Sequence, residues 1–150
     1  MERAEPHIQR KIHTAVIAFE IAMMKLVMKM PQQHATHSAS VSNPTCGDRV
    51  DISLIVEDDC IRAVSAAVRG CALCEAGAGL LMDGVRDMPL RDLAPMRDAL
   101  TAWLGGDDKA AVSDDMTSFA PVRAIRNRHK CVTLAYEAGV KALSHDGEAG

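Results

Sequence analysis

Three cysteines stand in settings that favour the thiolate, the form of the side chain that attacks electrophiles and binds metals. Cys46 lies two residues before Asp48, and in an extended segment such residues point the same way, so both can face one metal ion. Cys71 follows a predicted strand and begins a predicted helix, where free backbone N–H groups and the helix dipole stabilise an anion. Cys131 follows a run of basic side chains: Arg126, Arg128, His129 and Lys130. Thiolates with a carboxylate suit zinc or the iron of a [2Fe–2S] cluster, and the ligand types alone do not separate the two.

The remaining cysteines are Cys60 and Cys74. Cys60 begins a predicted strand, where a free cysteine is usually a small buried hydrophobe. Cys74 forms a CxxC pair with Cys71 at the start of a helix, which is also the arrangement used for thiol–disulfide exchange. A thiol–disulfide oxidoreductase is therefore one alternative, although it leaves Cys46 and Cys131 without a role. A structural zinc protein is another, although the long spans between the cysteines match no compact zinc finger.

The hydrophobic pattern predicts a hairpin followed by helices. Two β-rich runs, 51–56 and 61–68, are joined at 57–59, which predicts an antiparallel hairpin. A short edge strand is expected between 32 and 44. Helices are predicted over 7–30, from 71 to about 85, over 90–104 and over 129–143, with a short helical piece after Pro121. Residues 107–118 are expected to form a charged linker.

Composition and charge narrow the class of protein. The chain has 150 residues, of which 48% are hydrophobic and 25% charged, as expected for one globular domain. A net charge of −3 offers no broad basic surface for phosphates, and one Trp, one Tyr and two Phe offer few platforms for stacking bases. We therefore expect no nucleic-acid partner.

The cysteine count and the apolar N-terminal segment bear on the compartment. Five cysteines without a dense disulfide framework favour a reducing compartment, and the cytoplasm fits best. The apolar segment 12–30 is interrupted by Glu20, Lys25 and Lys29. These charges make a membrane span costly, so we expect an amphipathic helix there, with no membrane association.

Three motifs around the cysteines together resemble those of the NifU/IscU/SufU family of iron–sulfur cluster assembly proteins. They are Asn43–Asp48 (NPTCGD) before the strand pair, Gly70–Ala72 (GCA) opening a helix, and Arg128–Ala135 (RHKCVTLA). The last motif is most similar to the SufU-like branch, because IscU carries a histidine directly before its final cysteine and this chain carries Lys130. The resemblance covers about residues 43–143.

The resemblance implies an α+β fold in which a small antiparallel sheet packs against several helices, the SufE/NifU-like or IscU-like fold. It divides the chain into an N-terminal helix and polar loop at 1–42, a NifU/IscU-like core at 43–143 and a tail at 144–150. All three are expected to belong to one structural domain. The N-terminal helix is a candidate oligomer contact.

The resemblance also implies a function. Cys46, Asp48, Cys71 and Cys131 would be the ligands of zinc or of a [2Fe–2S] cluster. The partners would be a cysteine desulfurase dependent on pyridoxal phosphate, which donates sulfur, and apo-proteins that receive the cluster. Such a protein is a scaffold or sulfur carrier more than a conventional enzyme.

Within the resemblance, we expect Cys46 to be the sulfur acceptor, since a flexible loop can expose it while Cys71 is held by its helix. Accessory roles beside the metal are expected for Cys74, Arg128 and His129.

Overall fold

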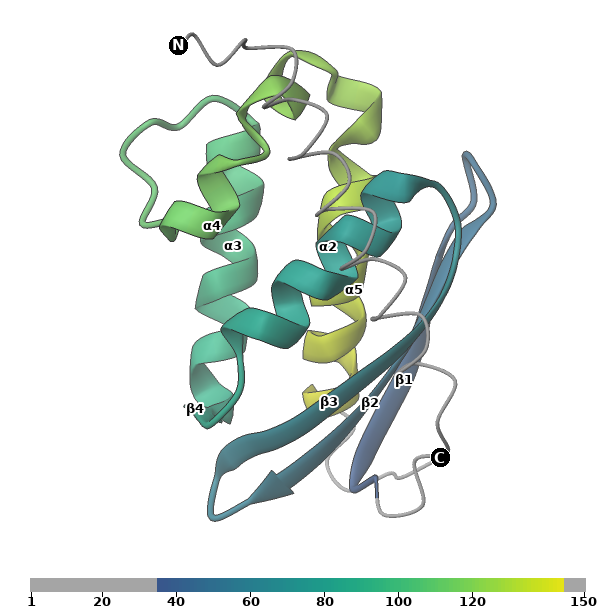
Figure 1. The fold of residues 1–150 in the computed structure, drawn as a ribbon, viewed down its shortest axis with the longest axis vertical. Coiled ribbons are helices and arrows are strands. Elements are labelled where there is room, and N and C mark those ends of the chain that lie inside the picture. Colours follow the sequence, from purple (N-terminus) through teal and green to yellow (C-terminus); the bar gives the residue numbers. More distant parts are fainter. Residues whose placement is uncertain (1–34, 145–150) are drawn as a thin grey trace, which may run out of the picture.

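The computed structural model describes residues 35–144, which form an antiparallel sheet covered on one face by helices (Figure 1). The predicted α+β class with a small antiparallel sheet is confirmed. The predicted N-terminal helix over 7–30, its proposed oligomer contact and the tail from 145 lie outside the described residues. No helix within 35–144 is both long and apolar enough to cross a membrane.

The sheet has four strands in the order β1-β2-β3-β4, and each strand is antiparallel to its neighbour. They span His37–Asn43 (β1), Asp48–Glu57 (β2), Cys60–Arg69 (β3) and Met88–Pro89 (β4). The predicted hairpin is β2 and β3, and the expected edge strand is β1, which pairs along its full length with β2. The two-residue strand β4 was not predicted, because two residues carry no alternation to detect.

The β2–β3 turn explains why the hairpin forms where it does. Asp58 and Asp59 both have positive φ, at 53° and 61°. Two such residues make the tight turn whose twist matches that of paired strands, and Asp tolerates this backbone region better than most residues. The turn therefore sets the pairs Glu57↔Cys60 and Val56↔Ile61, and the register shifts by one residue between Val56 and Ile55.

The helical layer consists of α2, α3, α4 and α5. They span Ala72–Gly84 (α2), Leu93–Leu104 (α3), Asp114–Thr117 (α4) and His129–Ser144 (α5), with 3₁₀ turns at Leu90–Asp92, Ala120–Ala124 and Arg126–Arg128. The predicted linker 107–118 contains the short helix α4, which begins because the Ser113 hydroxyl accepts a hydrogen bond from the Met116 N–H at 3.3 Å.

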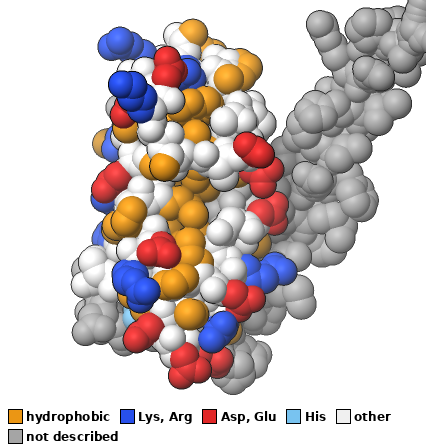
Figure 2. Space-filling model, turned by 90° about the vertical axis from the view of Figure 1, so that its left-hand side faces the viewer, with side chains coloured by type: hydrophobic (Ala, Val, Ile, Leu, Met, Phe, Trp, Pro, Cys, Tyr) orange, Lys and Arg blue, Asp and Glu red, His pale blue; other side chains and the backbone are white. Residues whose placement is uncertain are grey.

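Helix α5 is the centre of the fold. One side of it packs on β1 and β2, and the other side contacts α2 and α3 (Figure 1). Its buried residues therefore surround most of the helix, from Cys131 to Ala142. The largest side chains that are fully buried in the core are Tyr136, Ile52, Leu54, Ile61, Leu81 and Leu93. On the face formed by α3 and α4, an apolar band runs between charged side chains (Figure 2).

A glycine brings α2 and α5 together. A Cβ built on Gly77 would lie 2.3 Å from the Val132 carbonyl oxygen and 3.0 Å from its carbonyl carbon. Because these are backbone atoms, they cannot rotate away, and a larger residue would force the two helices apart. Gly77 therefore sets the spacing between the two helices that carry Cys71 and Cys131.

We expect the substitution Gly77→Ala to lower the free energy of unfolding by about 3 kcal/mol, because overpacking a close backbone contact costs roughly that much. Urea unfolding followed by circular dichroism measures the change. Gly84→Ala is the matched control in the same helix, since a Cβ there meets no atom within 4 Å. Equal stability of both variants would show that the helices adjust freely.

Candidate metal centre

The turn between β1 and β2 presents Cys46 and Asp48. Asn43 organises this turn: its backbone carbonyl accepts a hydrogen bond from the Gly47 N–H at 2.8 Å, and its side-chain oxygen accepts one from the Thr45 N–H at 3.1 Å. Cys46 is exposed at the turn, whereas Asp48 begins β2 and is 7% exposed. The two side chains hydrogen bond to each other. The Cys46 thiol and the Asp48 carboxylate therefore do lie close together, as predicted. They meet across a turn, whereas the prediction placed them along an extended strand.

Cys71 lies at the N-terminal end of α2, as predicted, and Cys74 lies at the first turn inside the helix. The Cys71 carbonyl accepts hydrogen bonds from the N–H groups of Cys74 at 3.0 Å and Glu75 at 3.2 Å, which begin the helix. Cys71 is half-buried and Cys74 has no exposed surface. Cys131 reaches the same place from the first turn of α5 and is 1% exposed.

Three thiols from two helices converge on one carboxylate oxygen. The Asp48 Oδ2 atom lies 3.0 Å from the Cys74 Sγ, 3.4 Å from the Cys131 Sγ and 3.9 Å from the Cys71 Sγ. Within 35–144 these four residues form a group whose possible ligand atoms all lie within 4.8 Å of one another. Zinc–sulfur bonds of about 2.3 Å place tetrahedral ligands about 3.8 Å apart, so the donors already lie near the spacing of a four-coordinate site.

The thiols stabilise the negative charge on Asp48. Hydrogen bonds from Cys46 and then Cys74 lower the pKa of the Asp48 carboxyl below its ordinary value, although its burial acts in the opposite direction. With the nearby positive charge of Arg128 acting in the same direction, buried Asp48 favours its charged form, which can bind a cation.

The thiols themselves differ in acidity. Burial alone would raise the pKa of Cys71, but the N–H groups of Cys74 and Leu73 and the neighbouring thiols lower it, as expected at a helix N-terminus. Burial, followed by the hydrogen bond to Asp48, raises the pKa of Cys74. Burial and the hydrogen bond to Cys71 raise the pKa of Cys131 to about 11. Of these three thiols, Cys71 is therefore the one that ionises most readily.

The cluster is built around a close approach of the backbone at Gly70. A Cβ on this residue would lie 2.9 Å from both the Cγ and Oδ1 atoms of Asp48 and 3.1 Å from the Cys74 Sγ. Only a residue without a side chain therefore lets the carboxylate and this thiol meet. The donor set, its burial and this space fit a thiolate-binding metal such as zinc or iron.

Two basic residues predicted beside the site have different positions. The Arg128 guanidinium donates to the sulfurs of Cys131 and Cys71, so this exposed cation lies at the edge of the cluster. The His129 Nε2 atom instead lies 3.0 Å from the Val122 carbonyl oxygen and 3.1 Å from that of Arg123. Within 35–144 no hydrogen bond joins His129 to Asp48 or a thiol, so this histidine holds the preceding 3₁₀ turn in place.

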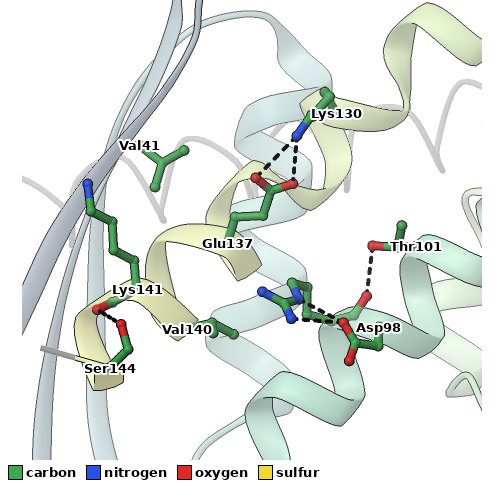
Figure 3. A pocket seen from close by; sticks show the side chains of 9 residues that line it. Val41, Asp98, Thr101, Lys130, Glu137, Val140, Lys141 and Ser144 are labelled. Atoms are coloured by element: carbon green, nitrogen blue, oxygen red, sulfur yellow. Dashed lines mark hydrogen bonds and ion pairs between the residues drawn. The ribbon is translucent and has the colours of Figure 1, made fainter. Parts of the chain in front are cut away.

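A surface groove elsewhere on the molecule contains none of these residues. Val41, α3 and α5 line it, and Figure 3 shows that its charged side chains are largely paired within it. Lys130 pairs with Glu137 at 3.3 Å and Arg97 with Asp98 at 2.9 Å. Side chains that neutralise one another offer little charge to a ligand, so the thiol cluster remains the candidate site.

The structure brings together Asp48, Cys71 and Cys131 as predicted, and it adds Cys74 as a full member of the group. From the sequence, Cys74 was expected to have only an accessory role. Its position three residues after Cys71 could have indicated that the two thiols lie together, because residues at i and i+3 of a helix share a face. Cys60 lies half-buried at the start of β3, outside the group.

Comparisons with known proteins agree with this geometry. No protein-family model matches the chain. Among curated proteins, it is 24% identical over 127 residues to the iron–sulfur cluster assembly scaffold protein IscU of Streptococcus pyogenes serotype M1, covering 81% of this chain and 80% of that protein. It is 22% identical over 108 residues to the zinc-dependent sulfurtransferase SufU of Bacillus subtilis strain 168, covering 71% of this chain and 74% of that protein.

Solved structures share the fold. FiSufU from Fervidobacterium islandicum AW-1, described as an iron–sulfur cluster assembly scaffold protein for the SUF system, superposes with a TM-score of 0.68 at 19% identity over 83% of this chain and 93% of that one. The N-terminal part of a NifU-like protein from Brucella abortus gives a TM-score of 0.66 at 21% identity, over 85% and 95%. The chain is therefore similar to NifU/IscU/SufU proteins over most of its length, in sequence and in fold. The resemblance predicted from the three cysteine motifs is thereby confirmed.

We expect Gly70→Ala to weaken Zn²⁺ binding by roughly 10- to 100-fold, the loss typical when the support of a ligand is removed, because the added methyl group displaces Asp48 and Cys74. Competition with a chromogenic chelator measures the affinity, and Gly84→Ala serves as the control. An unchanged affinity would show that the close approach at Gly70 is not needed for the site.

Proposed function

We propose that this protein is a scaffold or sulfur acceptor in iron–sulfur cluster assembly, which binds a metal ion or a [2Fe–2S] cluster and receives sulfur from a cysteine desulfurase dependent on pyridoxal phosphate. The observation that carries the proposal is the convergence of three thiols on Asp48 in a buried site. The likeness to IscU and to SufU supports it. Apo-proteins that take up the cluster are the second class of partner, and the five free thiols support a reducing, cytoplasmic setting.

The donor set suits a cargo that has to be released. Asp48, Cys71 and Cys131 are ligands in the proposed site, and the fourth donor comes from Cys46 or Cys74. A single carboxylate oxygen among thiolates is a harder and less covalent ligand for zinc or iron, so its bond exchanges more readily. When bound, the metal ion keeps its thiolate ligands deprotonated. Arg128 at the edge of the cluster offsets part of the negative charge that several thiolates and a carboxylate bring together.

In this proposal Cys46 accepts the sulfur. It is exposed on a turn, whereas Cys74 and Cys131 are buried. In the transfer, the Cys46 thiolate attacks the terminal sulfur of the persulfide on the desulfurase. A new S–S bond forms to the Cys46 Sγ, the donor's S–S bond breaks, and the donor cysteine leaves as a thiolate with the electron pair. No net oxidation occurs, so no further reactant is required.

A thiol–disulfide oxidoreductase that uses Cys71 and Cys74 is the second candidate. The observation that favours it is the pairing of a half-buried thiol of lowered pKa with a buried thiol of raised pKa in one CxxC segment. It gives no role to the hydrogen bonds that Asp48 receives from Cys131 and Cys46.

Anaerobic purification, metal analysis and an absorption spectrum before and after addition of iron and sulfide test the proposal. We expect bound zinc or a reconstituted cluster. A metal-free protein that forms no cluster and still reduces disulfides would instead establish the oxidoreductase.

We expect Cys46→Ser to reduce sulfur transfer from a cysteine desulfurase to background, because a hydroxyl cannot replace the attacking thiolate. Mass spectrometry of the whole chain measures the added sulfur after the desulfurase has been supplied with cysteine. Cys60→Ser is the matched control, since Cys60 lies outside the cluster. Transfer to the Cys46 variant at the unmodified rate would assign the acceptor role to another thiol.

A further inference from the structure

The site contains one thiol more than a four-coordinate metal needs. Cys46, Cys71, Cys74 and Cys131 all interact with Asp48, which makes five potential donors. Structural zinc sites are almost always tetrahedral. With Asp48, Cys71 and Cys131 as ligands, Cys46 and Cys74 compete for one remaining position.

Cys74 is the better placed of the two. Among the three buried or half-buried thiols its sulfur lies nearest to Asp48 Oδ2, at 3.0 Å, and it has no exposed surface. It belongs to the group whose ligand atoms lie within 4.8 Å of one another, and Cys46 does not. Gly70 leaves room for this sulfur, since a Cβ there would come within 3.1 Å of it.

The cost of ordering also favours Cys74. Its side chain is fixed in the first turn of α2 and is held in the core before any metal binds. Cys46 also contacts Asp48, but it lies on an exposed turn outside the buried group, so its coordination would require ordering of a solvent-exposed side chain. A donor that is already in position binds the metal at a lower entropic cost.

From these contacts we infer that Cys74 replaces Cys46 as the fourth metal ligand in this protein, so that Asp48, Cys71, Cys74 and Cys131 hold the metal and Cys46 stays free. This inference rests on the proposed function and deepens it. The acceptor thiol then takes up sulfur without leaving a metal, and the four ligands remain in place throughout the transfer. Binding the metal and accepting sulfur are thereby assigned to different cysteines.

The test compares Cys46→Ser with Cys74→Ser in the full chain, both in a Cys60→Ser background. We expect the Cys46 variant to retain one zinc per chain with an affinity within about threefold of the parent. The zinc affinity of the Cys74 variant should fall by more than 100-fold, since removal of a residue that only supports a ligand already costs roughly 100-fold. With Co²⁺ as the probe, thiolate charge-transfer absorption should be unchanged in the Cys46 variant and lower by about one third in the Cys74 variant, as three thiolates become two.

A second measurement does not depend on folding of the Cys74 variant. Zinc-loaded Cys60→Ser protein is treated with iodoacetamide, and peptide mass spectrometry is followed together with zinc release. We expect Cys46 to be alkylated first, with the zinc retained. Zinc release in step with Cys46 alkylation, or loss of zinc from the Cys46 variant while the Cys74 variant keeps it, would overturn the inference and leave the proposed metal site intact. A parent protein that binds neither zinc nor Co²⁺ would overturn both.

Discussion

The contact between α2 and α5 is the constraint on which the rest of the site depends. The Gly77 backbone lies against the Val132 carbonyl, so the two helices approach more closely than any side chain would allow. This contact places the first turn of α5 beside the first turn of α2. Cys131 can then meet Cys71 and Cys74, although it lies far from them in the sequence. The helices bring the thiols, and the sheet contributes Asp48 from the start of β2.

The electrostatics of the cluster follow from this packing. Burial alone disfavours both a carboxylate and a thiolate. Asp48 nevertheless favours its charged form, because thiols donate hydrogen bonds to it. Cys71 favours the thiolate, because the start of α2 supplies N–H groups. Arg128 is the cation that interacts directly with these sulfurs among the described residues. A metal ion would supply the missing positive charge and would also release the thiol protons of Cys74 and Cys131.

The fold separates this cluster from its other surface features. The groove beside α3 and α5 contains paired charges, and the apolar band on the α3 and α4 face lies between charged side chains (Figures 2 and 3). Cys46 differs from both, because it is an exposed thiol on a turn whose next residues lead directly to buried Asp48. A partner that approaches this turn would meet the Cys46 thiol before it meets the buried thiols.

The sequence by itself determined the hairpin, the three longer helices of the described region and the resemblance to NifU/IscU/SufU proteins, because turn residues, periodicity and the cysteine motifs are local properties of the chain. It also indicated Asp48, Cys71 and Cys131. It did not reveal β4 or α4, which are too short to show a period. Only the tertiary structure decided how the five cysteines divide: Cys74 joins the buried group, Cys46 stays exposed and His129 turns to the backbone. The physical reason is that helix spacing and the space at Gly70 depend on contacts between segments distant in sequence, and no local pattern records them.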